Sequence, residues 1–280
     1  MAELNTIVED IYDLFRNKPK FHEDRIKGFA TALAERIQER MEEERGKPAL
    51  RMSQLGAKCD RQLWYKINVP ELAEALPPEA KIKFLFGDIL EEFLLFLAEE
   101  AGHDVKGRQD ELNIGGVKGH RDAIIDGTLV DAKSASSYSF QKFANHLSWE
   151  DDSFGYIDQL GAYLEGSQQD DQLTNKDAAA FLVIDKTLGK ITLDVHPKRH
   201  IDYEEKVRDK QAIVRQPAPP PRAFFDKPEG KSGNRKLGIE CSYCSFKNTC
   251  WPNLRTFYYS KGPVYLTHVA RKPKVGENNV

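Results

Sequence analysis

The chain of 280 residues contains no apolar run close to the ~20 residues that a membrane-spanning helix needs. Its N-terminal segment, MAELNTIVEDIYDLF, is acidic and amphipathic. That segment lacks the basic start and the short apolar core of a signal peptide. We therefore expect a cytoplasmic protein that does not associate with membranes.

The sequence also has few cysteines and no Gly-rich phosphate-binding loop after a strand. The missing loop argues against a doubly wound nucleotide-binding fold, and there are no internal repeats. With 40% hydrophobic and 30% charged residues, the composition is that of an ordinary globular protein. The length predicts one large domain, or one domain with a small appendage.

An excess of positive charge is absent as well. The formal net charge of -3 argues mildly against nucleic-acid binding by the whole surface. A local basic groove remains compatible with this total, and two stretches are candidates for it. They are residues 222–236 and the group Arg271, Lys272 and Lys274. The alternative is that both stretches are solvated loops.

Hydrophobic periodicity predicts an α/β fold with a central mixed sheet flanked by helices. Helices are expected twice within residues 1–50, after Cys59, and over 79–101, 154–164 and 200–215. The apolar residues of the 79–101 helix nearly encircle it, which predicts burial on most sides. Strands are expected over 111–126, 127–135 and, as a second pair, 178–195. A proline-rich connector, a cysteine-rich segment and an irregular tail follow.

Three charged residues mark the first strand pair. Asp122 is expected on one strand and Asp131 with Lys133 on the next, joined by a turn at Asp126-Gly127. The turn brings Asp122 close to Asp131, and strand alternation places Asp131 and Lys133 on one face. Carboxylates suit Mg²⁺ or Mn²⁺. Such an ion can polarise a phosphoryl oxygen, and a lysine can stabilise the developing charge.

Taken alone, this D-x8-D-x-K spacing is weak, because three charged residues in a hairpin are usually a solvated face. The flanking residues Ile124, Ile125 and Val130 are apolar, so the strands are expected to face the core. Charged residues inside buried strands need a reason. The hairpin is therefore a candidate catalytic site.

Two predicted helices offer further site residues. Glu91 and Glu92 interrupt the otherwise apolar 79–101 helix, and we prefer Glu91 as the third carboxylate, although either could be simply exposed. Gln159 and Tyr163 are four residues apart and share one helix face. Both side chains can contact phosphate. An ordinary amphipathic helix is the alternative for this pair.

The four cysteines form one pattern. Cys241, Cys244 and Cys250 are spaced C-x2-C-x5-C, and Cys59 lies far upstream. A disulfide framework is not expected in a cytoplasmic chain of this size. Zinc sites more often use two close pairs. We favour a 4Fe–4S cluster, which also needs four thiolates, and keep zinc and inert thiols as alternatives.

Six motifs in order together resemble the RecB-like exonucleases of the PD-(D/E)xK superfamily, in particular its iron–sulfur branch. That branch includes the CRISPR-adaptation-associated nucleases and the nuclease domain of AddB. The motifs are KCDRQLWYK at Cys59, FGDILEE at 86–92, GHRD at 119–122, DAKS at 131–134, QLGAY at 159–163 and CSYCSFKNTCW at 241–251. The resemblance covers roughly residues 51–255.

The resemblance implies a restriction-endonuclease-like core and a role for each matching residue. Asp122 and Asp131 would be metal ligands together with the Ala132 carbonyl, and Lys133 would be the catalytic lysine. Gln159 and Tyr163 match the family's Q-x3-Y helix motif, and the four cysteines would hold the cluster. Many relatives have a histidine ligand where this chain has Glu91, which shifts the expected metal preference away from Mn²⁺.

The function expected from these features is a Mg²⁺- or Mn²⁺-dependent exonuclease acting on DNA ends in replication, repair or recombination, with a possible protein partner from those processes. Alternatives are a structure-specific endonuclease, a non-catalytic DNA-binding module and a zinc-stabilised scaffold. Expected DNA contacts include Lys142, and either Tyr138 or Phe140 could stack on bases. The predicted segments are a helical appendage (1–50), the nuclease domain closed by the cluster (51–255) and a tail (256–280).

Overall fold

The computed structural model describes residues 3–17, 21–42 and 47–278. The chain divides into two compact units: unit 1 comprises Met1–Gly56 and Pro77–Arg208, and unit 2 comprises Ala57–Leu76 and Asp209–Val280. These units interleave along the chain, whereas the segments predicted from the sequence are consecutive. That segmentation stays a prediction, and both of its end segments include residues outside the described ranges.

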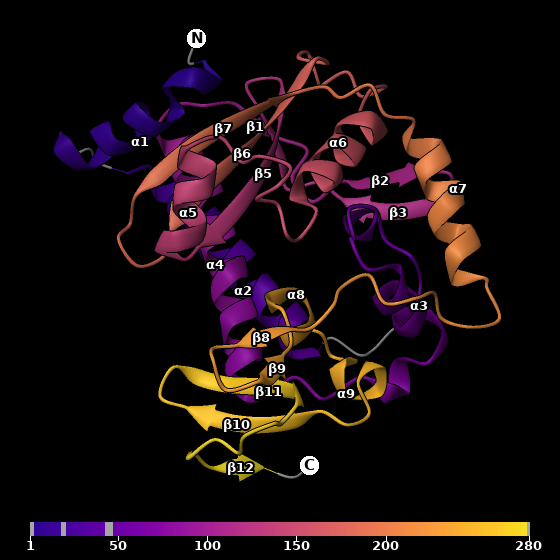
Figure 1. The fold of residues 1–280 in the computed structure, drawn as a ribbon. Coiled ribbons are helices and arrows are strands. Elements are labelled where there is room, and N and C mark those ends of the chain that lie inside the picture. Colours follow the sequence, from indigo (N-terminus) through magenta and orange to yellow (C-terminus); the bar gives the residue numbers. More distant parts are fainter. Residues whose placement is uncertain (1–2, 18–20, 43–46, 279–280) are drawn as a thin grey trace. The chain divides into compact units, whose positions relative to one another are not determined.

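Unit 1 is built on a five-stranded sheet in the order β1-β4-β5-β6-β7 (Figure 1). Its strands are β1 (Val105–Lys106), β4 (Ala123–Ile125), β5 (Thr128–Ala135), β6 (Ala178–Asp185) and β7 (Ile191–Pro197). The β5–β6 pair is parallel and the other pairs are antiparallel. The predicted mixed α/β fold with a central mixed sheet is therefore confirmed. A separate hairpin joins β2 (Glu111–Ile114) to β3 (Val117–His120).

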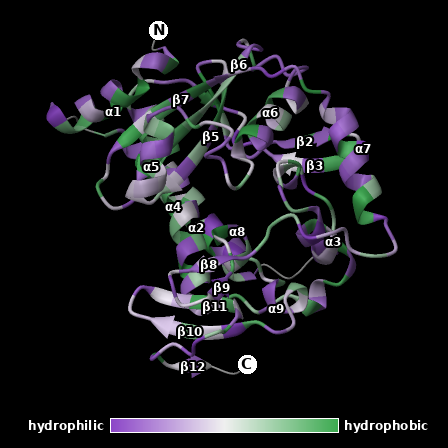
Figure 2. Cartoon of the chain, viewed as in Figure 1, coloured by the Kyte–Doolittle hydropathy of each residue, from purple (hydrophilic) through white to green (hydrophobic). Residues whose placement is uncertain are grey.

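Helices cover both faces of this sheet. The helices and short 3-10 turns of unit 1 are η1 (Leu4–Thr6), α1 (Ile7–Arg16), α2 (Glu23–Glu42), η2 (Met52–Gln54), α4 (Pro78–Glu100), α5 (Ser137–Ala144) and α6 (Tyr156–Gly166). One buried cluster joins α5, α6 and the β2–β3 hairpin to one face of the sheet. A second cluster joins α1 and α4 to the other face. Strand β6 is mostly hydrophobic (Figure 2), as expected for a strand buried on both faces, whereas β5 is mostly buried but carries polar residues among its apolar ones.

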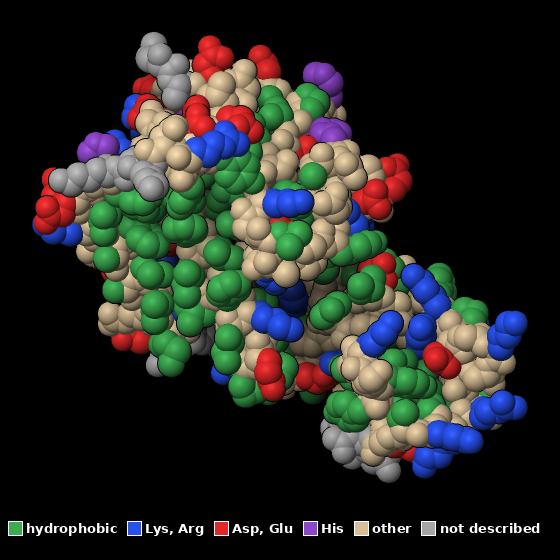
Figure 3. Space-filling model, turned by 90° about the vertical axis from the view of Figure 1, so that its left-hand side faces the viewer, with side chains coloured by type: hydrophobic (Ala, Val, Ile, Leu, Met, Phe, Trp, Pro, Cys, Tyr) green, Lys and Arg blue, Asp and Glu red, His purple; other side chains and the backbone are tan. Residues whose placement is uncertain are grey.

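Two helix predictions need correction. The long helix α4 is not buried on most sides, because Ile82, Phe84 and Phe86 in its first half are exposed, and only its second half enters the core. Figure 3 shows how much hydrophobic surface lies open on one face of the molecule. Helix α5 was not expected from the sequence. It places Phe140 in the core, so Phe140 cannot stack on DNA bases, whereas Tyr138 is exposed.

Unit 2 contains a second five-stranded sheet, in the order β12-β10-β11-β9-β8. Its strands are β8 (Lys227–Glu229), β9 (Asn234–Lys236), β10 (Arg255–Tyr259), β11 (Gly262–His268) and β12 (Glu277–Asn278). Its helical segments are α3 (Asp60–Asn68), η3 (Pro70–Leu72), α8 (Ile239–Ser242) and α9 (Lys247–Cys250), while α7 (Tyr203–Val214) begins in unit 1. The expected irregular tail is wrong, since Phe257 and Leu266 on β10 and β11 are fully buried.

Among the described residues, no helix is both long and apolar enough to span a membrane.

Candidate functional site

The predicted site lies where strand β5 extends beyond its neighbour β4. Strand β4 pairs with β5 only from Thr128 to Val130. The rest of β5, starting at Asp131, keeps its parallel partner β6 on one side and has no β4 partner on the other. Asp122 was expected within a strand, but it immediately precedes β4. The site is therefore built on the unpaired edge of β5, with the Asp122 carboxylate beside it.

Asp122 is tied to this edge through a backbone hydrogen bond. The Ala132 amide donates to Asp122 Oδ2 at 2.8 Å. In a β-strand, the N–H and C=O groups of one residue point toward the same side. The Ala132 carbonyl therefore also points to the edge that β4 leaves uncovered, and it is available as an oxygen ligand next to Asp122.

Asp131 is the most enclosed carboxylate of the site, with 1% of its surface exposed. Its Oδ1 accepts a hydrogen bond from Gln159 Nε2 at 3.2 Å. Its Oδ2 makes no hydrogen bond within the described part of the chain and faces the Lys133 ammonium as an ion pair. The ammonium also lies 5.7 Å from the centre of the Tyr156 ring. The structure thus brings Asp131, Lys133 and Gln159 together.

The third carboxylate comes from helix α4. Glu91 accepts a hydrogen bond from Gln109 Nε2 at 2.8 Å and lies 3.9 Å from the Arg36 guanidinium. Glu92 is buried and paired with Arg36 and Arg108. Glu92 is thus held by two guanidinium groups, whereas Glu91 has one at 3.9 Å, and the choice of Glu91 as the site acid stays a prediction.

Helix α6 carries Gln159 and Tyr163 and is anchored at its start. The buried Asp152 accepts hydrogen bonds from the amides of Gly155, at 2.8 Å, and Ile157, at 2.9 Å. Gly155 has a φ of +80°, and a Cβ there would lie 2.0 Å from the Gly56 carbonyl oxygen. Only glycine fits this close crossing, which fixes where the helix begins and therefore where Gln159 points.

Tyr163 is buried next to the two aspartates. Burial raises the pKa of its hydroxyl, and the nearby Asp131 and Asp122 carboxylates raise that pKa further. The hydroxyl therefore stays protonated at neutral pH and can act as a hydrogen-bond donor. The six predicted side chains therefore lie close enough to interact with one another; they are Glu91, Asp122, Asp131, Lys133, Gln159 and Tyr163.

The carboxylates of this neighbourhood repel one another. Burial raises the pKa of Glu91 to about 7, while Lys133 and Arg36 act in the opposite direction. Burial, Asp131 and Glu91 raise the pKa of Asp122 well above its usual value. Burial lowers the pKa of Lys133, but the carboxylates of Asp131 and Asp122 outweigh this and raise it overall, so the lysine stays charged. A buried site with more carboxylates than it can keep ionised suits a bound dication.

Sequence reasoning missed three residues beside the site: Arg36, Gln109 and Tyr156. Gln109 adopts a left-handed conformation, with a φ of +56°, which is uncommon for a residue other than glycine. Arg36 comes from helix α2 and Tyr156 opens helix α6. No local sequence signal marks any of the three, because their proximity arises from tertiary packing.

The four cysteines all belong to unit 2. Cys59 precedes α3, where its sulfur accepts a hydrogen bond from the Gln62 amide at 3.4 Å. Burial, followed by the neighbouring thiols of Cys244, Cys59 and Cys250, raises the pKa of the Cys241 thiol to about 11. The other three thiols therefore lie close enough to Cys241 to influence its ionisation. All four are free of disulfide bonds.

The segment around Cys59 is packed against the segment that carries the other three cysteines. The rings of Tyr65 and Phe246 stack at 5.4 Å. Glu74, which follows α3, is paired with Lys247, and its amide donates to the Ser245 carbonyl at 2.7 Å. These contacts hold the distant cysteine next to the triplet within unit 2.

Several candidate DNA-contacting cations are already engaged. Lys142 donates to the Asp151 carbonyl at 2.9 Å. Arg222 donates to the Cys250 carbonyl, and Arg235 is paired with Asp226. Lys231 is exposed and Lys236 is half-buried, so these two lysines are the better candidates in the 222–236 stretch.

No protein family and no curated protein matches the sequence. Among solved structures, the chain is similar to the crystal structure of SSO0001, with 18% identity, covering 79% of this chain and 95% of that chain at a TM-score of 0.44. It is also similar to LHK-Exo, an alkaline exonuclease from Laribacter hongkongensis, with 13% identity, covering 60% of this chain and 87% of that chain at a TM-score of 0.35. LHK-Exo in complex with dAMP is similar at 13% identity, 60% and 85% coverage and a TM-score of 0.37. All three scores lie below 0.5, so the chemistry of this chain has to come from its own residues.

Proposed function

We propose that the chain is a divalent-metal-dependent nuclease that hydrolyses phosphodiester bonds of DNA. The observation that carries the proposal is the convergence of Glu91, Asp122 and Asp131 with Lys133 at the uncovered edge of β5. The motif resemblance supports the same reading, because each of its site motifs contributes a side chain to this place.

The residues present fit a hard divalent cation. Oxygen ligands are available from Glu91, Asp122, Asp131 and the Ala132 carbonyl, and Mg²⁺ and Mn²⁺ prefer such ligands. The buried Asp131 Oδ2 atom makes an ion pair with Lys133 but no hydrogen bond in the described residues, and a carboxylate oxygen in such a place can also coordinate a cation. A bound ion would polarise a phosphoryl oxygen and supply a hydroxide nucleophile.

The side chains around this position have distinct tasks. The Lys133 ammonium, kept charged by its carboxylate neighbours, can stabilise the negative charge that develops on the phosphate. Gln159 fixes the orientation of Asp131 through its hydrogen bond. The protonated Tyr163 hydroxyl and the Gln159 amide group can contact the DNA backbone. We further infer that attack starts at DNA ends, as in the exonucleases that the motifs resemble.

We also propose that the four cysteines hold a 4Fe–4S cluster in unit 2. The proposal rests on the sequence pattern, in which the distant Cys59 joins a C-x2-C-x5-C triplet and completes the four thiolates that such a cluster needs. All four cysteines belong to unit 2, and the three other thiols raise the pKa of Cys241, so they lie near it.

The test is incubation of the purified protein with end-labelled single- and double-stranded DNA, with and without Mg²⁺. We expect cleavage that requires the ion and disappears with EDTA. Full activity in EDTA would overturn the metal-dependent mechanism. Absence of cleavage on every DNA substrate, with Mg²⁺ or Mn²⁺ present, would favour the non-catalytic DNA-binding alternative.

A further inference from the structure

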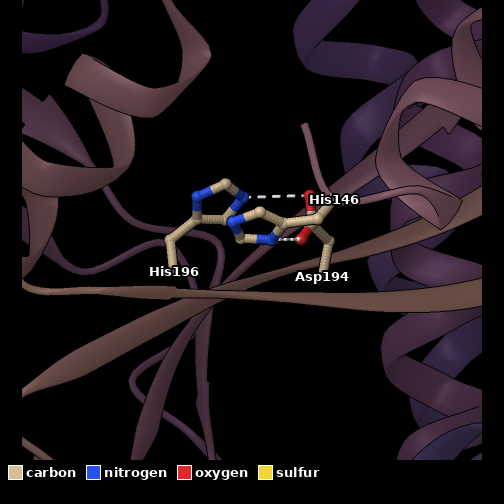
Figure 4. Close-up of side chains that lie close together, drawn as sticks. All are labelled: His146, Asp194 and His196. Atoms are coloured by element: carbon tan, nitrogen blue, oxygen red, sulfur yellow. Dashed lines mark hydrogen bonds and ion pairs between the residues drawn. The ribbon is translucent and has the colours of Figure 1, made fainter. Parts of the chain in front are cut away.

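Two histidines converge on one aspartate in unit 1, apart from the residues of the proposed nuclease site. His146 Nδ1 lies 2.7 Å from Asp194 Oδ1, and His196 Nε2 lies 2.9 Å from Asp194 Oδ2 (Figure 4). The two imidazole rings stack with their centres 4.5 Å apart. One nitrogen of each ring and one carboxylate oxygen all lie within 4.8 Å of one another.

The chain builds this cluster from two elements. Asp194 and His196 are two residues apart on β7, so strand alternation directs both side chains to the same face. His146 comes from the loop after α5 and has a φ of +64°. This left-handed conformation is uncommon outside glycine, and strained backbone positions cluster at functional sites. The Leu147 amide donates to Asp194 Oδ2 at 3.0 Å and fixes the loop against the strand.

The histidines also line a pocket of about 270 Å³. Its apolar wall includes Leu160 and Leu164 of helix α6 and Ala179 of strand β6. Asp194 and His196 are buried, whereas about 61% of the His146 side chain is exposed. The cluster is therefore rigid on the strand side and accessible on the loop side, next to a space that can hold water or a small molecule.

The charge around the pocket does not oppose a cation. Two basic side chains line it, and each is engaged by an acid: Lys198 lies 3.0 Å from Glu165, and Arg199 lies 3.0 Å from Asp158. The Asp194 carboxylate is itself held by His146, His196 and the Leu147 amide.

We propose that His146, Asp194 and His196 form a second metal site, selective for a borderline divalent transition ion such as Zn²⁺. Two imidazole nitrogens and one carboxylate oxygen suit zinc, whereas Mg²⁺ prefers sites made of oxygen alone. Three protein ligands leave a position for water or a bound molecule, as in zinc sites that take part in chemistry. This proposal shares no residue with the nuclease site and does not depend on it.

Cobalt can test this site because its visible spectrum reports the ligand type. Mg²⁺ is added in excess to occupy the carboxylate site. Under this condition we expect the protein to bind Co²⁺ and to show d–d absorption bands, which disappear when Zn²⁺ displaces the Co²⁺. A thiolate site would add intense sulfur-to-cobalt charge-transfer bands, so ion binding at the cysteines is distinguishable in the same spectrum. His146→Asn should weaken the affinity for the histidine-type ion by at least ~10-fold.

Asparagine is the chosen replacement because it tolerates the left-handed backbone of residue 146. His196→Gln provides a second variant in the strand, and circular dichroism establishes that each variant is folded. His200→Asn, at an exposed residue outside the cluster, is the matched control and should bind the ion like the wild type. Equal Co²⁺ affinity and spectra in the wild type and in His146→Asn would overturn the proposal. In that case, Asp194 serves only to hydrogen-bond the loop to the strand.

Discussion

Lys133 and Asp131 are two residues apart on strand β5 and form an ion pair, in which the carboxylate is buried and the lysine is half-buried. The aspartate is held from the other side by Gln159. The ammonium is therefore fixed next to the carboxylates before any substrate arrives. Such preorganisation is what makes a charged group effective in catalysis.

Lys133→Ala should reduce DNA cleavage by more than ~100-fold, the scale on which removal of one preorganised electrostatic group acts. The measurement is the initial rate on end-labelled DNA with Mg²⁺. Lys142→Ala is the matched control, because Lys142 contacts a backbone carbonyl away from the carboxylates. A wild-type rate in a folded Lys133→Ala preparation would remove this lysine from the mechanism.

Neighbouring glutamates on helix α4 should respond differently to the same substitution. Glu91→Gln should raise the Mg²⁺ concentration needed for activity, because Glu91 is a proposed ligand. Glu92→Gln should instead lower stability by about 1–3 kcal/mol, because Arg36 and Arg108 would each lose their buried charged partner. Magnesium titrations of activity and denaturant unfolding of both variants distinguish the two roles. The reverse pattern would show that Glu92 is the ligand.

Glu91 should also make stability depend on pH when no metal is bound. Its pKa is raised from 4.5 to about 7, so the folded state holds the proton more tightly than the unfolded state does. The free energy of unfolding therefore falls as the pH rises from 4.5 to about 7, by up to about 3 kcal/mol. In EDTA, Glu91→Gln should gain stability relative to the wild type at pH 8 but not at pH 4. An equal difference at both values would contradict the raised pKa.

Much of the site could be predicted because it depends on local geometry. Alternation along β5 places Asp131 and Lys133 on one face, and the turn at Asp126-Gly127 has positive φ at both residues, as the hairpin signal predicts. Gln109 could not be predicted, because its contact with Glu91 depends on how a loop packs against helix α4. Such packing is not encoded in any local pattern.

The second sheet was missed for a different reason. Residues 255–268 alternate in the manner of two strands around a turn at Gly262, so a signal was present. The proline run and the cysteines before it indicated irregular structure and outweighed that signal. Phe257, fully buried on β10, shows that this part of unit 2 has a core of its own.

Loss of one cysteine ligand should destabilise unit 2. By analogy with cross-links that close long loops, the proposed cluster should contribute several kcal/mol, up to about 5. Cys241→Ala should therefore become protease-sensitive and lose bound iron and the absorbance near about 400 nm expected of iron–sulfur thiolate sites. Tyr243→Ala, an exposed residue between two ligands, is the control and should keep both properties. Stoichiometric zinc without iron in the native protein would favour the zinc alternative.

The preference for DNA ends can be tested with a covalently closed single-stranded circle and its linear form. An enzyme that must take up a free end finds none on the circle, so the linear strand should be degraded at least ~10-fold faster. Contacts should be mainly to phosphates, with a log–log salt slope of about -0.7 per contact on single strands. Lys231 and Lys236 should contribute to that slope, and replacing both by alanine should flatten it. Arg235 should be left in place, because it is paired with Asp226. Equal rates on the circle and the linear strand would exclude the exonuclease and establish the endonuclease alternative.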